Sequence, residues 1–320
     1  ERRLPQDGRF NIKVKKHSID VRVSTMPVQY GEACVMRLLD QSSGILSLDQ
    51  VGMPPDILKR VRHLIHRPHG MLLVTGPTGS GKTTTLYGAL SELNTEEKKV
   101  ITVEDPVEYR LPRISQVQVS NKIGLDFARV LRTTLRQDPD IIMVGEMRDQ
   151  ETVEIGLRGA LTGHLVLSTL HTNDAVSSAI RLLDMGAAGY LVASSLRGII
   201  AQRLVRRICS KCKEEYVPSE AELMELELRS DDVAGRTFFR GTGCSACNSS
   251  GYKGRLAVFE MMVLDDLIRE MIMSQASTAL LRQESRKRGM RTLRESGLLS
   301  IYDGRTTIDE VLRETISEEV

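Results

Sequence analysis

A glycine-rich run early in the chain has the residue types and spacing of a phosphate-binding loop. Residues 76–83 read Gly-Pro-Thr-Gly-Ser-Gly-Lys-Thr and match the pattern G-x-x-x-x-G-K-[ST] at every fixed position. Glycine leaves backbone N–H groups open to phosphate oxygens, which side chains would otherwise block. Lys82 should reach the β- and γ-phosphates, and the Thr83 hydroxyl should bind Mg²⁺. The expected nucleotide contacts are Gly76, Pro77, Thr78, Gly79, Ser80, Gly81, Lys82, Thr83 and Thr84.

The flanking segments favour a nucleoside triphosphate site over a chance glycine-rich loop. Residues 71–75 are mostly apolar and predict a short buried strand, and residues 83–90 predict a helix. The N-terminal end of such a helix is electropositive and faces the same phosphate oxygens. The whole unit therefore has the order strand, phosphate loop, helix.

Acidic side chains follow two further predicted strands, at residues 100–103 and 141–144. Glu104 and Asp105 come directly after the first strand, and Glu146 follows the second after one glycine. Because α/β sheets bind ligands at the carboxyl ends of their strands, these carboxylates should lie beside the phosphate loop. Glu146 is placed to serve Mg²⁺ or the attacking water, although the usual acid is an Asp directly after the apolar run. Solvated strand ends are the alternative.

A histidine and a row of arginines lie near the same predicted edge. His171 ends the predicted strand 165–170, where a γ-phosphate sensor that hydrogen-bonds is favoured over a catalytic base or a structural histidine. Arg129, Arg132 and Arg136 share one face of a helix that leads into the second acidic strand. Such a basic row is usually solvated surface.

The first forty residues add two more arginines of interest. Residues 10–14 and 19–23 alternate apolar and polar side chains and predict a β-hairpin, with Arg22 on its polar face. In a third predicted strand, residues 33–39, Arg37 is in line with apolar residues. Either its stem packs while the guanidinium reaches water, or the guanidinium binds a phosphate held by a neighbour.

Four of the five cysteines form two C-x-x-C pairs, Cys209 with Cys212 and Cys244 with Cys247. Four thiolates make the closed tetrahedral set that structural Zn²⁺ prefers, with no position left for water. In a chain with a phosphate loop and no export signal, metal ligation is favoured over disulfides. The fifth cysteine, Cys34, is expected in a core.

The composition limits the other functions that the chain could have. The 320 residues carry 44 Lys and Arg against 42 Asp and Glu, and this net charge of +2 gives no global argument for binding nucleic acid. No apolar run approaches the ~18 residues of a membrane span. The chain has no visible signal peptide and opens with Glu1, so we interpret it as a cytoplasmic fragment whose natural N-terminus is missing.

Periodicity and turn residues divide the rest of the chain. Expected are a linker at residues 41–50, a helix at 54–66, helices after the last core strand to about residue 206, a helix at about 220–228 between the cysteine pairs, and helices from residue 260 onward.

Taken together, several ordered stretches resemble the type II/type IV secretion ATPase superfamily. Residues 76–87 correspond to its Walker A motif, 102–108 to its Asp box, 135–140 with 144–149 to its Walker B motif, and 162–173 to its His box. The two C-x-x-C pairs are similar to those of the type II secretion and type IV pilus assembly branch, since pilus retraction ATPases typically lack them. The resemblance covers essentially the whole chain.

The resemblance implies a bacterial homohexamer in the cytoplasm, at the inner face of the inner membrane. Such a motor uses ATP and Mg²⁺, yields ADP, and moves an inner-membrane platform protein that drives pilin or pseudopilin into a fibre. Membrane association would be through partners only, and no nucleic acid is involved. The implied fold is α/β, with an α+β lobe at residues 1–45 that ends a PAS-like N-terminal domain, a RecA-like P-loop NTPase core at 46–205, a tetracysteine Zn²⁺ subdomain at 206–258 and a helical part at 259–320.

The resemblance also implies roles for single residues. Glu104 matches the general base, and Glu146 matches the Walker B carboxylate that holds Mg²⁺ with Thr83. The family's phosphate-reaching arginines fall at Arg22, Arg37, Arg132, Arg136 and Arg148. For Arg37 this favours the phosphate contact, because an arginine finger contributes roughly 10³–10⁵ in rate.

Two other classes of protein remain as alternatives. A nucleic-acid motor of the same broad fold would carry aromatic stacking residues and a basic channel, but aromatics make up 4% of the chain and Trp is absent. A nucleotide-gated regulatory module would bind the nucleotide without useful turnover.

Overall fold

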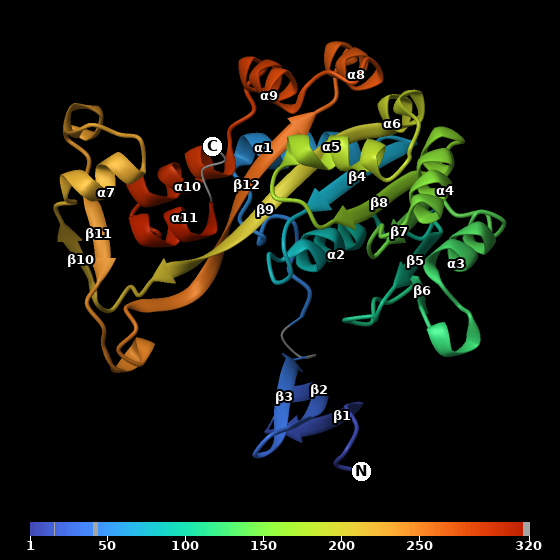
Figure 1. Ribbon diagram of the computed structural model, residues 1–320, viewed down its shortest axis with the longest axis horizontal. Helices are drawn as coiled ribbons and strands as arrows, with labels where there is room; N and C mark the ends of the chain where they lie inside the picture. Colours follow the sequence, from blue (N-terminus) through green and yellow to red (C-terminus); the bar gives the residue numbers. More distant parts are fainter. Residues whose placement is uncertain (16, 41–43, 316–320) are drawn as a thin grey trace.

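A seven-stranded sheet forms the centre of the computed structural model, which describes residues 1–15, 17–40 and 44–315 (Figure 1). Lys16 of the hairpin turn, residues 41–43 of the expected linker and residues 316–320 of the expected helical part lie outside the described residues. The strand order is β12-β9-β4-β8-β7-β5-β6. The strands are β4 (Gly70–Thr75), β5 (Val100–Glu104), β6 (Ser115–Gln118), β7 (Ile141–Val144), β8 (Leu165–Leu170), β9 (Leu196–Ile208) and β12 (Tyr252–Val263).

The strand that carries the phosphate loop, β4, lies inside a parallel block. It pairs with β8 and β9, and the parallel pairing continues through β7, β5 and β6. Every residue of β4, β5, β7 and β8 is buried, as the apolar runs in the sequence predict for strands covered on both faces. Because parallel strands share one direction, their carboxyl ends meet at one edge. The predicted α/β fold with a RecA-like core is confirmed.

Helices cover the two faces of this sheet. Leu72 and Val74 point to the face covered by α1 and α2, whereas Met71 and Leu73 point to the face of the other helices. Asp126, Asp149 and Asp174 cap the N-termini of α3, α4 and α5 by accepting a backbone N–H. The helices are α1 (Pro55–Ile65), α2 (Lys82–Leu93), α3 (Phe127–Thr134), α4 (Gln150–Leu161), α5 (Ala175–Asp184), α6 (Gly189–Ser195), α8 (Asp266–Met273) and α9 (Thr278–Lys287).

Two segments that were predicted to be helical are strands. Helices do not continue to residue 206, because α6 ends at Ser195 and β9 begins at Leu196. Helices also do not begin at residue 260, because β12 continues to Val263. Strand β9 pairs with β4 on one side and β12 on the other, and this pairing of backbone groups outweighs the local helical pattern. The expected domain boundaries at residues 205/206 and 258/259 therefore fall inside β9 and β12.

Residues 1–15 and 17–40 form a lobe with a small antiparallel sheet, which is separate from the central sheet and lies below it in Figure 1. Its strands β1 (Gln6–Val14), β2 (His17–Val28) and β3 (Gly31–Asp40) confirm the three predicted strands, and the described residues of this lobe contain no helix. The register places Arg9, Arg22 and Arg37 side by side across the three strands. Arg22 and Arg37 thus share one face of the lobe.

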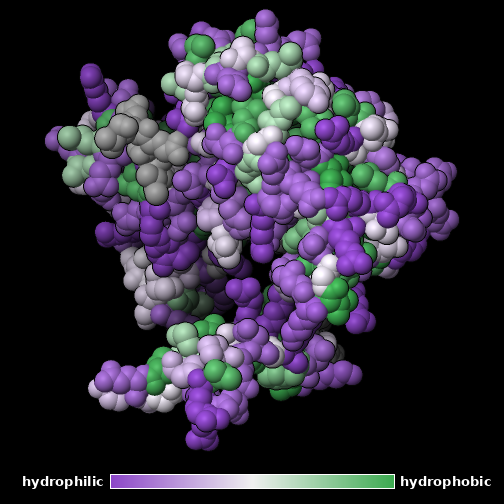
Figure 2. All heavy atoms as spheres, turned by 45° about the vertical axis from the view of Figure 1, so that its right-hand side comes forward, coloured by the Kyte–Doolittle hydropathy of each residue, from purple (hydrophilic) through white to green (hydrophobic). Residues whose placement is uncertain are grey.

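The other face of this N-terminal lobe is apolar, and most of its side chains are exposed although Val21 at its centre is buried. Phe10, Met36 and Leu38 are large apolar side chains that remain exposed there, and Figure 2 shows apolar side chains on the surface of the lobe. Cys34 lies on this face and is exposed, so the prediction that it packs in a core is wrong. Its neighbours Met36 and Leu38 on the same face of β3 are also exposed, so this strand is not packed against a second layer in the described residues.

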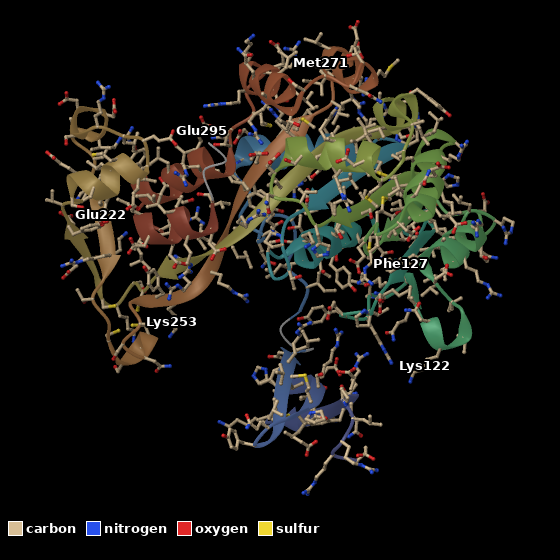
Figure 3. The ribbon with its side chains drawn as sticks, viewed as in Figure 1. Lys122, Phe127, Glu222, Lys253, Met271 and Glu295 are labelled. Atoms are coloured by element: carbon tan, nitrogen blue, oxygen red, sulfur yellow. The ribbon has the colours of Figure 1, made fainter. Side chains whose placement is uncertain are left out.

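A cysteine lobe extends from the ends of β9 and β12, at the end of the molecule opposite α3. Figure 3 shows Glu222 and Lys253 at this end, and Phe127 and Lys122 at the other. The helix α7 between the cysteine pairs confirms the predicted inserted helix, and Leu223 packs with Phe238 and Val311 in a separate small core. The remaining elements are β10 (Lys213–Tyr216), α7 (Glu220–Glu225), β11 (Phe238–Gly241), α10 (Leu293–Tyr302) and α11 (Ile308–Glu314). None of the helices in the described ranges is long and apolar enough to cross a bilayer.

Glu260 is a buried carboxyl on β12 that joins the first turns of two helices. Its carboxylate accepts the Ala175 N–H of α5 at 2.8 Å and the Leu293 N–H of α10 at 3.2 Å. Burial raises the pKa of Glu260 to about 7 from an ordinary 4.5, although the two N–H donors oppose this shift.

We expect Glu260 to make the free energy of unfolding fall as the pH rises from about 4.5 to about 7. The folded chain keeps a proton in this range that the unfolded chain releases, and the effect is at most about 3 kcal/mol. Urea unfolding of the wild type and Glu260→Gln near pH 5 and near pH 8 measures it. The wild type should lose stability relative to the variant, and parallel behaviour would contradict the raised pKa.

Candidate active site

The phosphate loop connects β4 to α2 and leaves its backbone groups open. Gly76, Gly79 and Gly81 have φ angles of 148°, 85° and 89°, which L side chains rarely adopt. Helix α2 begins at Lys82 without a side-chain cap, so the first N–H groups of the helix are available to a bound group. Residues 77–79 of the loop are exposed. The loop therefore presents backbone donors to phosphate oxygens.

Two side chains of the loop region are suited to an anion. Lys82 Nζ donates to the first two carbonyls of the loop, at 2.7 and 3.0 Å, and burial lowers its pKa to about 8 despite the opposing effect of Glu146. Ser80 Oγ is buried and has no hydrogen-bond partner among the described residues. A phosphate would supply acceptors for both groups, and Thr83 at the start of α2 is exposed and open to Mg²⁺. The loop residues thus fit a magnesium nucleotide.

Glu104 ends β5 as predicted, but its carboxylate faces the protein. The residue is 3% exposed and accepts hydrogen bonds from Tyr87 of α2, Thr102 of β5 and Gln116 of β6. Burial and the Glu104 charge raise the pKa of Tyr87 far above its usual range, so the phenol remains a donor. A general base must reach water or a reacting hydroxyl, and here three protein donors occupy the carboxylate.

Glu146, Arg148 and His171 form a cluster at the same sheet edge. Arg148 pairs with Glu146 and also lies 3.8 Å from Asp105, which connects the ends of β7 and β5. His171 Nε2 lies 3.3 Å from the second oxygen of Glu146. The charge of Glu146 also acts on the pKa of Lys82, so this acidic cluster is within electrostatic reach of the phosphate loop. The structure brings these predicted residues together.

The two N-terminal arginines have other surroundings in this structure. Arg22 donates to a carboxylate oxygen of Glu108 at 2.8 Å and to a backbone carbonyl beside it, in the segment that follows β5. Arg37 is exposed next to Arg22. Neither forms a hydrogen bond or ion pair with residues 76–84 in the described part of the chain. Arg22 is nevertheless held close to the strand end that carries Glu104.

The arginines of α3 and of the turn that follows it also have partners outside the phosphate loop. Arg132 forms an ion pair with Glu151 of α4, and Arg136, which lies in the turn two residues after α3, donates to the Arg132 carbonyl. Both are exposed. Of the five expected phosphate-reaching arginines, only Arg148 lies in the cluster with Glu146, within the described residues.

Several residues of the site were not predicted from the sequence. Tyr87 and Gln116 hold Glu104, and Gln202 and Arg203 of β9 contact the two loops of the site. The signal for the last two is a polar Gln-Arg pair inside the apolar run at residues 199–205. It was missed because this segment was assigned to a helix.

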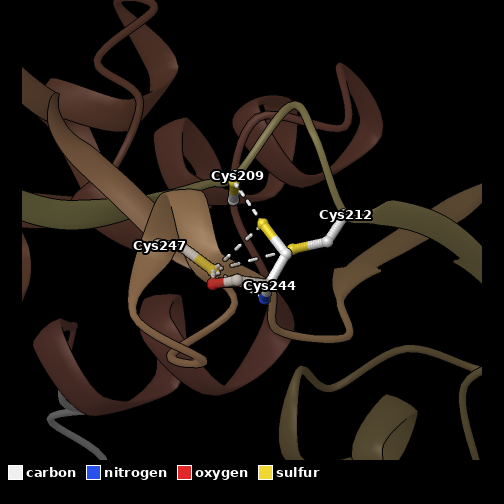
Figure 4. Close-up of side chains that lie close together, drawn as sticks. All are labelled: Cys209, Cys212, Cys244 and Cys247. Carbon is white, nitrogen blue, oxygen red and sulfur yellow. Dashed lines mark hydrogen bonds between the residues drawn. The ribbon is translucent and has the colours of Figure 1, made fainter.

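The four paired cysteines form a second site, in the cysteine lobe (Figure 4). Their sulfurs all lie within 4.8 Å of one another, and three of the distances are 3.9, 3.8 and 3.7 Å. Tetrahedral Zn²⁺ with Zn–S bonds of ~2.3 Å requires sulfurs ~3.8 Å apart. Burial opposes ionisation of Cys247, but the backbone N–H groups of Cys244 and Gly251 donate to its sulfur and lower its pKa. The donor set and spacing fit structural Zn²⁺.

The phosphate loop and the acidic strand ends, arranged on this strand order, define a P-loop nucleotide-binding protein with a RecA-like core. Comparison with known proteins narrows the class. Residues 1–313 match the family model described as "Type II/IV secretion system protein", and the chain belongs to that family.

Relatives within the family have known names. The chain is 51% identical over 315 residues to the type II secretion system protein HxcR of Pseudomonas aeruginosa. The aligned residues cover 98% of this chain and 63% of that relative. It is 47% identical over 316 residues to the type IV pilus assembly ATPase PilB of Thermus thermophilus, covering 99% of the chain and 36% of that relative. The chain thus spans less than two thirds of the length of these relatives.

The fold is also similar to a solved structure. The crystal structure of the pilus retraction motor PilT with bound ADP aligns with a TM-score of 0.70 and 28% identity, over 99% of this chain and 79% of that one.

We expect Cys209→Ser to lower the bound zinc from about one ion per chain to near zero, because a closed tetrahedral site needs all four thiolates. Elemental analysis of the purified protein gives this number. Cys34→Ser is the matched control, since Cys34 is exposed and lies outside the cluster. Equal zinc content in the two variants would contradict the assignment.

Proposed function

We propose that this chain is the ATP-hydrolysing part of a hexameric motor for type II secretion or type IV pilus assembly. The observation that carries the proposal is the shared edge of the sheet, where a phosphate loop faces the cluster of Glu146, Arg148 and His171. The names of HxcR and PilB, and the ADP bound to PilT, support the same reading.

The roles of the residues follow from what each can donate or accept. The loop N–H groups and Lys82 would bind the phosphates. Thr83 and Glu146 would hold Mg²⁺, which would supply positive charge beside the phosphate oxygens. Glu146 or Glu104 accepts the proton of the attacking water; Glu104 can do so only after losing some of its present donors. His171 would hydrogen-bond to the γ-phosphate when that group is bound and to Glu146 when it is not. The position of its side chain would therefore depend on whether the γ-phosphate is present.

We assign to the N-terminal lobe the positive charges that complete the catalytic site. Arg22 and Arg37 share one face of that lobe, and Arg22 already contacts the segment after β5. Movement of this lobe, or of the lobe of a neighbouring subunit, would bring them to the γ-phosphate, so hydrolysis would depend on lobe position. Arg132 and Arg136 are exposed and suited to a site on an adjacent subunit.

The proposed partners are five further copies of the chain and an inner-membrane platform protein, met at the cytoplasmic face of the membrane. Movement of the platform protein, driven by ATP hydrolysis, would add pilin or pseudopilin to a growing fibre.

Lys82→Ala should abolish both nucleotide binding and turnover, because it removes the one cation inside the loop. Glu146→Gln should bind ATP within a few-fold of the wild type but hydrolyse it about 10²–10⁴ times more slowly, since only the acid–base and Mg²⁺ functions are lost. Phosphate release and binding of a fluorescent ATP analogue separate the two effects. Normal turnover in Glu146→Gln would remove this residue from the mechanism.

Arg37→Ala should lower the hydrolysis rate about 10³-fold while ADP affinity stays unchanged, because the arginine acts only in the transition state. Lys13→Ala is the control, since Lys13 is an exposed cation of the same lobe. Steady-state ATPase measurements compare the two. If both variants turn over ATP at the wild-type rate, Arg37 does not complete the site.

A further inference from the structure

Gln202 of β9 is a buried amide whose polar atoms both serve the phosphate loop. It is 1% exposed. Its Nε2 donates to the Ser80 carbonyl at 2.9 Å, and its Oε1 accepts from Thr85 Oγ1 at 2.7 Å. One side chain therefore holds the end of the loop and the first turn of α2 at the same time.

The loop packs on Gln202 so closely that two of its glycines are required there. A Cβ on Gly76 would lie 2.5 Å from the Gln202 carbonyl oxygen, and a Cβ on Gly81 would lie 2.7 Å from Gln202 Nε2. Both distances are too short for real carbon atoms. The glycines that open the loop to phosphate on one side thus also seat it against β9 on the other.

The next residue, Arg203, serves the second loop of the site. It is 7% exposed, and its guanidinium donates to the Asn173 carbonyl at 2.8 Å and to Asn173 Oδ1 at 3.3 Å. Asn173 lies two residues after His171, in the turn between β8 and α5. The positive charge of Arg203 also contributes to the lowered pKa of Lys82, which places it within electrostatic reach of the phosphate loop.

Consecutive residues of a strand point to opposite faces of the sheet, so this pair reaches both. Gln202 follows Ile200 onto the face of α2, and Arg203 lies with Ala201 and Val205 on the face of α5. We propose that Gln202 and Arg203 act as a positioning pair that fixes the phosphate loop and the His171 loop relative to each other. The inference rests on the proposed function, and neither residue is assigned a contact with the nucleotide.

Binding and turnover measured on the full chain test the two halves of the pair separately. Gln202→Leu keeps the volume but loses both hydrogen bonds to the loop, and it should weaken binding of a fluorescent ADP analogue about tenfold and raise KM more than it lowers kcat. Thr85→Val removes one of these bonds and should give a smaller change in the same direction, which keeps the test valid if the Leu variant does not fold.

Arg203→Leu should leave ADP affinity within about twofold and lower kcat about tenfold, because it releases the His171 loop and not the phosphate loop. Arg203→Lys should recover part of the rate, since it can still donate to the Asn173 carbonyl. Ser195→Ala is the control for stability alone, because Ser195 is buried and hydrogen-bonded to Leu157 far from the loop contacts.

If the two residues had a merely structural role, the Gln202 and Arg203 variants would have a lower melting temperature, as Ser195→Ala does, but unchanged ADP affinity, KM and kcat. That result would overturn the inference. A wild-type chain that binds ADP without hydrolysing ATP would contradict the proposed function. In that case the ADP affinities of Gln202→Leu and Thr85→Val would still test whether Gln202 positions the phosphate loop.

Discussion

Parallel hydrogen bonding between β4, β8, β7 and β5 is the constraint on which the site depends. Each strand is short and buried, so its backbone N–H and C=O groups must find partners in a neighbouring strand. Because the pairing is parallel, the chain must cross back between neighbouring strands, and these strands end at the same edge. The phosphate loop, Glu104, Glu146 and His171 come from four separate parts of the sequence and meet only for this reason.

Buried and half-buried polar side chains support this edge from inside the protein. Tyr87, Thr102 and Gln116 surround Glu104, and Gln202 holds the phosphate loop. Leaving one such buried partner unsatisfied costs about 1–3 kcal/mol, so these networks fix loop positions that apolar packing alone would leave free. The phosphate-binding side of the loop is different. Ser80 Oγ is buried without a hydrogen-bond partner in the described part of the chain, and Lys82 donates to loop carbonyls, so a bound phosphate would supply acceptors for both groups.

The lobes differ in how they join the core. The cysteine lobe is carried by β9 and β12, which continue from the central sheet without a break, and Arg206 of β9 is fixed to the buried Glu310 of α11. The N-terminal lobe contacts the core through Arg22 and Glu108. A continuous strand transmits displacement, whereas contacts between exposed or half-buried polar side chains permit a change of position. This contrast makes the N-terminal lobe the part suited to move against the nucleotide edge.

The sequence by itself determined the parts whose signals are local. The glycine spacing, the apolar runs of β4, β5, β7 and β8 and the C-x-x-C pairs each specify a structure within a few residues, and each was predicted. Only the tertiary structure decided that residues 196–208 form a strand, that Cys34 is exposed, that Glu104 faces three donors, and that Arg132 pairs with Glu151. These outcomes depend on partners distant in sequence. Backbone pairing across the sheet outweighs local helical preference, and the direction of a long charged side chain follows whichever opposite charge lies within reach.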